Sequence, residues 1–190
     1  GDRLTPGRLA HWLGVMRVMG ELAGMYVLDE EQASTAGLLH DAARDLTPER
    51  LIELAIAAGI DLDGPADRHP LYLHGPVGAF LVESELQVKD PLVLEAIASH
   101  SFHREGPNFD HLFCWCLRFA DILAPSHDWL GMRRLGEVVR AGRVEKASLL
   151  HCTWLIEYLA EQGVPIHPVL ERACRRRQAR RELPPSFFER

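Results

Sequence analysis

Apolar residues recur at helical spacing through nearly the whole chain, and this pattern most constrains the fold. In residues 7–26, for example, Val15, Val18 and Leu22 lie at positions that share one helix face. No segment shows the strict apolar–polar alternation, bounded by turn residues, that is typical of a strand. We therefore predict an all-α fold. Its helices are expected over residues 7–26, 30–43, 71–85, 90–100, 108–124, 129–141, 144–162 and 165–180, with one more in the segment 46–60.

The helix expected within residues 46–60 carries the clearest boundaries. Thr47 is suited to cap its N-terminus, and Pro48 to its first helical position. Gly59 is the residue at which such a helix ends. The segment that follows, residues 61–70, is rich in Asp, Gly and Pro, and we predict that it forms a loop.

Charge divides the chain into an acidic body and a basic tail. The formal net charge is −6, but residues 171–190 hold seven arginines against three glutamates, which leaves −10 for residues 1–170. No long linker or repeat interrupts the chain, so we predict one domain over 1–170 and a tail over 171–190 that completes the last helix and extends it. An acidic body argues against the broad basic face of a nucleic-acid-binding protein. The tail arginines either stabilise a solvated helix end or form an arm that binds polyphosphate or RNA.

Three further features predict the cellular compartment of the protein. The four cysteines form no C-x-x-C motif, and a chain of 190 residues needs no disulfides to fold, so we expect free thiols. No stretch approaches the roughly 18 apolar residues of a membrane span. The N-terminus lacks the basic and then apolar pattern of a signal peptide. We therefore expect a cytoplasmic protein without a membrane partner.

Several ionisable residues share their helix face with apolar neighbours and so should point inward. A single inward histidine is ordinarily a satisfied core residue, and we interpret His151, beside Ala147 and Leu155, in this way. Two inward aspartates are different, because a buried carboxylate without a partner costs several kcal/mol. Bound cations would offset that cost, and His and Asp ligands suit zinc, iron, manganese or nickel. The candidate ligands are His11, His40, Asp41, His74, His100 and Asp121.

The adjacent pair His40–Asp41 is the most informative part of this set. Neighbouring residues on a helix point about 100° apart. Two adjacent ligands of one metal therefore require a distorted helix end, or one of them bridges to a second metal.

These residues form a His…His-Asp…His…His…Asp pattern on helices that resembles the HD-domain metal-dependent phosphohydrolases. The segments "LHGPVGAFLV", "AIASH" and "RFADILAP" are similar to motifs of one branch, the YqeK family of symmetrical diadenosine tetraphosphate hydrolases. The similarity covers about residues 8–165.

The resemblance implies a compact helical bundle with a dinuclear metal site, and iron is the expected metal. Carried over by position, one ion would be held by His11, His40, Asp41 and Asp121. Asp41 would bridge to a second ion, held by His74 and His100. A hydroxide activated by the two ions would then attack a dinucleoside polyphosphate and release two ADP.

The resemblance also implies residues that contact the substrate. Arg44 stands where the family often has lysine, and it would act in catalysis and in phosphate binding; the alternative is a surface ion pair with Asp45 or Glu49. Ser101 and Arg104 match the hydroxyl and the arginine of a family loop motif. His127 stands where the family has arginine, and it is a weaker, pH-dependent cation. The chain also departs from the family at Ala124, where the family has glutamate, and at His103, where it has glycine.

Two other functions remain open at this point. One is an HD phosphohydrolase that acts on another nucleotide or on a small phosphoester. The other is a metal-bound nucleotide-binding or sensor module without turnover. The sequence also leaves open whether Phe187 and Phe188 dock on the body or on a second copy of the chain in a homodimer.

Overall fold

The computed structural model describes residues 6–62, 64–125 and 130–181. The prediction of an all-α fold is confirmed, since these residues form helices and no strand. The elements are α1 (Pro6–Tyr26), α2 (Glu30–Leu39), α3 (Pro48–Ala57), α4 (Gly64–Arg68), the 3-10 helix η1 (Pro70–Leu73), α5 (His74–Leu86), α6 (Pro91–Ser99), α7 (Leu112–Leu123), α8 (Leu130–Arg140), α9 (Val144–Glu161) and α10 (Pro168–Arg181).

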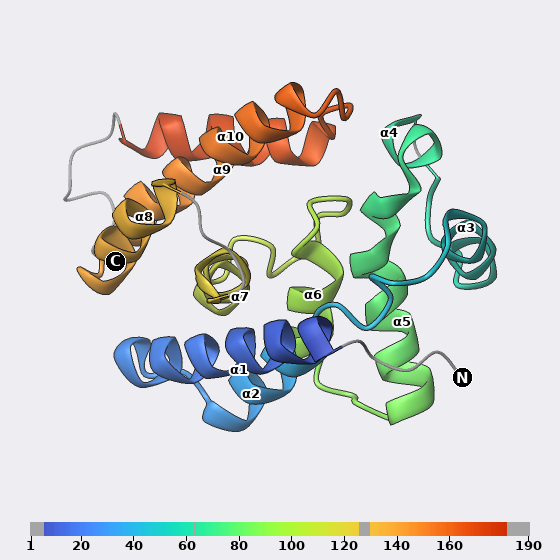
Figure 1. Cartoon of the computed structure of the whole chain (residues 1–190), viewed down its shortest axis with the longest axis horizontal. Helices are drawn as coiled ribbons and strands as arrows, with labels where there is room; N and C mark the ends of the chain where they lie inside the picture. The colour runs from blue at the N-terminus through green and yellow to red at the C-terminus, as the bar shows by residue number, and fades with distance from the viewer. Residues whose placement is uncertain (1–5, 63, 126–129, 182–190) are drawn as a thin grey trace.

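The helices surround α7, which lies near the centre of the molecule (Figure 1). Helices α1, α2, α6, α8 and α9 all contact α7. Every residue from Phe113 to Ala120 is buried, and all of them except Arg118 are apolar, as expected of a central helix. Helices α1 and α2 pack side by side below it, and α9 and α10 pack together above it (Figure 1).

Close packing of α1 against α2 depends on small residues. Ala33, Ala36 and Gly37 of α2 are buried, as their helical spacing predicts. A Cβ atom on Gly37 would lie only 2.7 Å from the Cα atom of Met16 in α1. The absence of a side chain at Gly37 therefore sets how closely the two helices approach, and it brings the end of α2 next to the start of α1.

The helix boundaries agree with the prediction at α3 and differ at α2. In α3, the Thr47 hydroxyl accepts a hydrogen bond from the Arg50 amide at 3.3 Å, and Gly59 has φ +66° after the helix. Helix α2 ends at Leu39 rather than at residue 43, and residues 40–45 form successive turns. The expected helix end was wrong because the apolar spacing continues after the backbone has left the helix.

Three other boundaries were also wrong. The expected loop over 61–70 contains α4 and the start of η1. The helix expected from residue 108 begins at Leu112, because Glu95 of α6 accepts hydrogen bonds from the backbone and the side-chain amide of Asn108 and holds that residue in a loop. The helix expected from residue 165 begins at Pro168.

Five arginines of the basic tail are paired within the molecule: Arg172, Arg175, Arg176, Arg177 and Arg180. Arg177 is buried, donates two hydrogen bonds to Glu145 at 2.7 and 2.8 Å, and also pairs with Asp110. Arg176 also pairs with Asp110, and Arg180 with Glu145. Arg176, Arg177 and Arg180 thus attach α10 to the body, a role that neither interpretation of the tail included. The anion-binding arm stays a prediction.

The boundary that we predict between domain and tail, at residue 170, is not tested by these contacts and stays a prediction. Phe187 and Phe188, which we considered as a docking segment, lie outside the described residues, and the homodimer stays a prediction as well.

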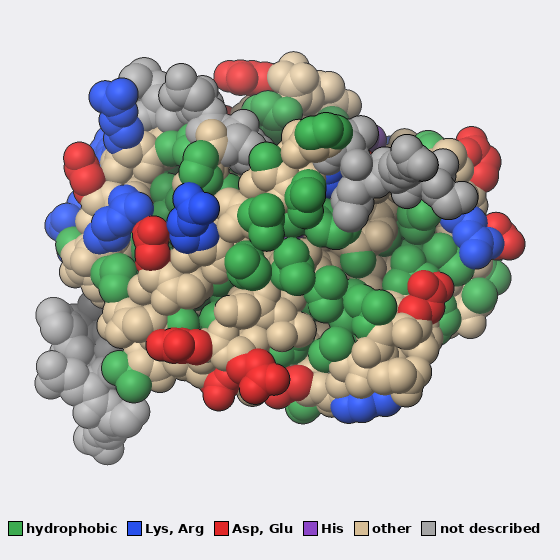
Figure 2. Space-filling model, turned by 60° about the horizontal axis from the view of Figure 1, so that its bottom comes forward, with side chains coloured by type: hydrophobic (Ala, Val, Ile, Leu, Met, Phe, Trp, Pro, Cys, Tyr) green, Lys and Arg blue, Asp and Glu red, His purple; other side chains and the backbone are tan. Residues whose placement is uncertain are grey.

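The face on which α1 and α2 lie carries many hydrophobic side chains (Figure 2). On α1, Leu9, Leu13 and Met25 are exposed.

All four cysteines are unbridged and buried, which confirms the expectation of free thiols. Among the described helices, none is both long enough and apolar enough to cross a bilayer.

Candidate metal centre

The structure brings all six candidate metal ligands together, although they come from five helices. His11 lies on α1, and His40 and Asp41 follow the end of α2. His74 is the first residue of α5, His100 follows the end of α6, and Asp121 lies in the last turn of α7. They form two trios whose ligand atoms lie within 4.8 Å of one another: His11, His40 and Asp121, and Asp41, His74 and His100.

Asp41 lies between the two trios and presents one carboxylate oxygen to each. Its Oδ1 lies 3.4 Å from His74 Nε2 and 3.6 Å from His100 Nε2. Its Oδ2 lies 3.7 Å from both His11 Nε2 and His40 Nε2. The Asp121 Oδ1 atom completes the first trio, 3.3 Å from His11 Nε2 and 3.6 Å from His40 Nε2. This is the geometry of a carboxylate that can bridge two ions.

The helix ends explain how Asp41 reaches this place. The Ala42 amide bonds the Leu39 carbonyl at 3.1 Å, and the Arg44 amide bonds the Asp41 carbonyl at 3.0 Å. These short turns replace the helical hydrogen bonds after α2. The sequence predicted that adjacent ligands need a distorted helix end or a bridge, and α2 does end at this pair.

Backbone carbonyls orient three of the histidine rings. The Nδ1 atoms of His40, His74 and His100 bond the carbonyl oxygens three residues earlier, at 2.9, 2.5 and 2.7 Å. Since a carbonyl only accepts, each Nδ1 carries the proton and each Nε2 presents its lone pair to the centre. This is the tautomer that a metal ligand needs.

Two observations indicate that the site fits cations. The Nε2 atom of His40 is buried without a hydrogen-bond partner among the described residues. The Nε2 atoms of His74 and His100 lie 3.0 Å apart, and both present lone pairs if their Nδ1 atoms are protonated. A metal ion satisfies all three atoms, because it accepts lone pairs where no proton donor is present.

The pKa shifts of the ligands are consistent with this interpretation. Burial opposes ionisation of Asp41, but the neighbouring histidines, His100 first among them, outweigh it and hold the Asp41 pKa well below its usual value. Burial, with His100 as the second cause, lowers the pKa of His74 to about 3, so its imidazole is neutral. Burial also disfavours charge on His40, but Asp121 and Asp41 outweigh it and raise its pKa. The two carboxylates thus attract positive charge to the centre.

A close approach of α5 to α6 places His74 against His100. A Cβ atom on Gly75 would meet Ser101 Oγ and would lie 3.0 Å from the Ala98 carbonyl oxygen. The Ser101 hydroxyl cannot move freely, because it donates a hydrogen bond to the Tyr72 carbonyl at 3.0 Å.

Replacing Gly75 with alanine should therefore separate the two histidines and weaken the second trio. We expect elemental analysis after gel filtration to give two metal ions per chain for the original protein and about one for Gly75→Ala. Gly64→Ala is the matched control, because its Cβ would meet nothing within 4 Å. Two ions per chain in Gly75→Ala would contradict this role of the glycine.

Only some of the substrate-contacting residues expected from the sequence line the cavity. Arg44 and Ser101 line the cavity beside the trios. Among the described residues, no ion pair joins Arg44 to Asp45 or to Glu49. Asp45 pairs with Arg8 instead. Arg104 is exposed and is not among the residues that line the cavity. His127 lies outside the described residues.

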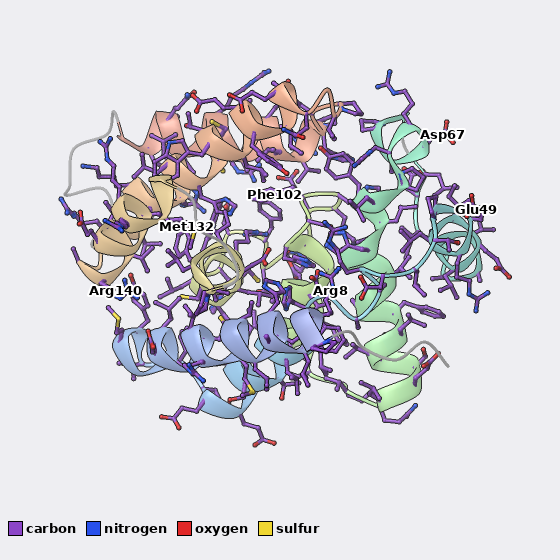
Figure 3. The ribbon with its side chains drawn as sticks, in the orientation of Figure 1. Arg8, Glu49, Asp67, Phe102, Met132 and Arg140 are labelled. Carbon is purple, nitrogen blue, oxygen red and sulfur yellow. The ribbon has the colours of Figure 1, made fainter. Side chains whose placement is uncertain are left out.

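Arg8 is a cavity residue that the sequence reasoning missed. It lies on α1, one turn before His11, and its Nη1 atom is 3.4 Å from Asp41 Oδ2 (Figure 3). Its guanidinium also donates a 3.1 Å hydrogen bond from Nε to Asp45. The spacing of three residues before His11 was the available signal, since residues at i and i+3 share a helix face.

The cavity has a volume of about 790 Å³. All candidate ligands except His40 line it, together with Arg8 and Arg44, and α9 contributes largely apolar side chains to the lining. Pockets of this size bind molecules as large as a nucleotide.

Comparison with known proteins places this site in a family. The model of the HD domain matches residues 8–126, which include all six candidate ligands. The chain belongs to the HD domain family. The family resemblance inferred from the sequence is confirmed.

Two relatives are enzymes of similar length. This HD-domain chain is 28% identical over 167 residues to the symmetrical bis(5'-nucleosyl)-tetraphosphatase of Bacillus subtilis (strain 168), covering 88% of this chain and 87% of that one. It is 29% identical to the enzyme of the same name from Halalkalibacterium halodurans, over 87% of this chain and 86% of that one. Its fold is similar to that of a crystal structure described as a predicted HD superfamily hydrolase involved in NAD metabolism, from Clostridium acetobutylicum. That match has a TM-score of 0.85 and 30% identity and covers 93% of this chain and 92% of that one.

Proposed function

We propose that this HD-domain phosphohydrolase cleaves diadenosine tetraphosphate symmetrically into two ADP, with two divalent metal ions as cofactors. The observation that carries the proposal is the position of Asp41, which presents one oxygen to each trio at the edge of a cavity large enough for a nucleotide. Two relatives of nearly the same length are symmetrical tetraphosphatases by name, which supports this choice of substrate.

Each trio would hold one ion. The first ion would be held by His11, His40, Asp121 and Asp41 Oδ2, and the second by His74, His100 and Asp41 Oδ1. When bound, two such ions lower the pKa of a water molecule and polarise a phosphoryl oxygen. Iron is the metal that we expect; manganese, nickel and zinc suit the same ligands.

Two arginines would act on the phosphates. Negative charge spreads over the equatorial phosphoryl oxygens during transfer, so cations beside the metal ligands stabilise it. Asp45 holds Arg8 in place, whereas Arg44 has no acidic partner among the described residues and is available to a phosphate. Ser101 keeps its hydroxyl proton on the Tyr72 carbonyl and would accept, rather than donate, a bond from substrate. A role for Arg104 would require that part of the substrate extend beyond the described cavity wall. A role for His127, which lies outside the described residues, stays a prediction.

Replacing Arg44 with alanine should lower turnover without removing metal. We expect kcat to fall by about 10²-fold, the typical effect of losing one charge-stabilising group, with the metal content unchanged. The measurement is steady-state kinetics beside elemental analysis of the same sample. Arg104→Ala is the matched control, because Arg104 does not line the cavity, and it should change kcat little. Loss of metal from Arg44→Ala would contradict the assigned role.

Product analysis tests the proposed reaction. The purified protein, with its metal content measured, is incubated with diadenosine tetraphosphate, and the products are separated by chromatography. Two ADP would support the proposal. ATP and AMP would contradict symmetrical cleavage but retain a phosphohydrolase.

One structural feature favours a second candidate, a phosphohydrolase for another nucleotide or a small phosphoester. Ala124, where the YqeK family has glutamate, is completely buried and lies near Gly14 of α1, so it offers no polar group to a substrate. Metal-bound protein that leaves diadenosine tetraphosphate intact should then be tested on a panel of phosphoesters. Failure on the whole panel would favour the nucleotide-binding module without turnover.

A further inference from the structure

Helix α7 carries a buried cation, Arg118. This residue is 1% exposed, and burial lowers the pKa of its guanidinium to about 10, so it is charged at neutral pH. Its hydrogen-bond acceptors among the described residues are uncharged. Nη1 donates to the Phe109 carbonyl at 2.9 Å, and Nη2 donates to the hydroxyl and the carbonyl of Ser99 at 2.9 and 3.3 Å. A buried charge is costly without an opposite charge beside it, so the position of Arg118 needs an explanation beyond filling the core.

Aromatic rings hold the guanidinium in place. Its Cζ atom lies 4.1 Å from the ring centroid of Phe109, 4.7 Å from that of Trp115 and 5.0 Å from that of Phe102 (Figure 3 labels Phe102). Cation–π attraction at these distances favours one position of the charge. The Phe102 ring also stacks on His151, with centroids 5.7 Å apart, and His151 is 3% exposed, as its interpretation as a core residue predicts. The position of the guanidinium therefore fixes that of its hydrogen-bond acceptors.

Arg118 connects the two segments that carry one metal ligand each. Asp121 of the first trio lies three residues after it on α7, on the same helix face. Ser99 directly precedes His100 of the second trio. The Ser99 carbonyl, which accepts from Arg118, also accepts from the Phe102 amide at 3.1 Å and so closes the turn that contains His100. One side chain thus holds the end of α6 against α7, one turn before Asp121.

The turn after His100 depends on this support. Phe102 has φ +58°, in the left-handed region that a residue with a Cβ atom enters only at a cost. The cation over its ring and the amide bond to Ser99 offset that cost. Without the guanidinium, we expect the turn to relax and to move His100 away from Asp41, whose Oδ1 atom lies 3.6 Å from His100 Nε2.

We propose that Arg118 is a positioning residue that sets the separation of the two metal trios by fixing His100 relative to Asp121. Arg118 is one of the residues that line the cavity, but both of its Nη atoms donate within the protein, so it is not assigned a contact with the substrate. The inference rests on the proposed function for the presence of two ions. It adds the residue that keeps them at a distance that one carboxylate can bridge.

Retention of manganese tests this role. Manganese-loaded protein is dialysed against buffers of decreasing free manganese, and the bound metal is measured by elemental analysis beside the electron paramagnetic resonance spectrum. Two manganese ions bridged by a carboxylate are exchange-coupled, and their spectrum differs from that of isolated ions. We expect two coupled ions in the original protein. Arg118→Met should weaken binding of the less tightly held ion at least about tenfold and replace the coupled spectrum with that of isolated ions.

Arg177→Met is the matched control. Arg177 is also buried, and its Cζ atom lies 4.7 Å from the centroid of the same Trp115 ring, but its partners Asp110 and Glu145 are not candidate metal ligands. This variant should lose stability but keep both ions and the coupled spectrum. An equal loss of manganese in the two variants would mean that Arg118 acts through general stability, and it would overturn the positioning role.

Ser99→Ala keeps the test decisive if Arg118→Met does not fold. Alanine removes the hydroxyl acceptor of Arg118 and keeps the carbonyl and the helix. The loss of one hydrogen bond should weaken binding of the less tightly held ion about threefold. Unchanged manganese binding in Arg118→Met, or in Ser99→Ala if Arg118→Met does not fold, would overturn the inference.

Metal binding and turnover separate this inference from the proposed reaction. If Arg118→Met loses the coupled ions and the original protein does not cleave diadenosine tetraphosphate, the positioning role is retained and the proposed reaction is lost. If the original protein cleaves this substrate and Arg118→Met keeps both ions, the reaction is retained and the positioning role is lost. One ion or none in the original protein would overturn both the dinuclear centre and the role of Arg118.

Discussion

Asp41→Asn is expected to lower turnover by at least about 10³-fold and to remove at least one of two bound ions per chain. Asparagine keeps the shape of the side chain but has one oxygen and no charge. It can no longer present an anionic oxygen both to the His74–His100 pair and to the His11–His40 pair. Elemental analysis and steady-state kinetics on one preparation measure both effects.

The control for this prediction is Asp45→Asn, four residues along the chain. Asp45 is exposed and pairs with Arg8, but it belongs to neither trio. It should keep both ions and lose only part of the activity, because Arg8 then loses its contact with Asp45 but keeps the one with Asp41. An Asp41→Asn protein that retains two ions per chain would show that the carboxylate does not bridge, and the assignment of the centre would have to change.

Arg177→Met is expected to destabilise the protein by about 3 kcal/mol, the lower end of the range for breaking a buried ion pair. The lower end applies because Arg177 is 2% exposed, while its partners Asp110 and Glu145 are partly exposed. For a chain of this length, the melting temperature should fall by roughly 6–12 °C. Calorimetry or circular dichroism measures the shift.

Arg175→Met is the matched control for the tail. Arg175 is exposed, and among the described residues it pairs within its own helix, with Glu171 at i−4. Exposed pairs of this kind contribute about 0.3–0.5 kcal/mol, so its melting temperature should change by a degree or two. Equal melting temperatures for the two variants would contradict the docking of α10 through Arg177.

The effect of Arg177→Met should depend on pH. Burial opposes ionisation of Asp110, but Arg177 and Arg176 outweigh it and lower the pKa of Asp110. A carboxyl whose folded pKa is lowered adds stability above its unfolded pKa of about 3.9 and loses it as the pH falls through the folded value. The difference between the variant and the original protein should therefore be largest near neutral pH and shrink below about pH 4.

The sequence by itself determined the features that depend on neighbours along the chain. Helical spacing of apolar residues identified the all-α class, and the cap at Thr47 with Gly59 gave the bounds of α3. The inward direction of the candidate ligands was also predictable, because a residue shares its helix face with those three and four positions away. The resemblance to the HD family then grouped them, and the structure places them together.

Tertiary structure decided what depends on residues far apart in the sequence. The partners of Arg177 lie 67 and 32 positions away, so its burial could not be inferred from the tail alone. Asn108 left the helix because Glu95 accepts its hydrogen bonds. The cavity beside the trios forms where residues of α1, η1, α5, α7, α9 and α10 and of the turns after α2 and α6 meet. The spacing of apolar residues shows which face of a helix is apolar. The free energy of a buried ion pair or of an unpaired nitrogen depends on the residues that another segment places beside it.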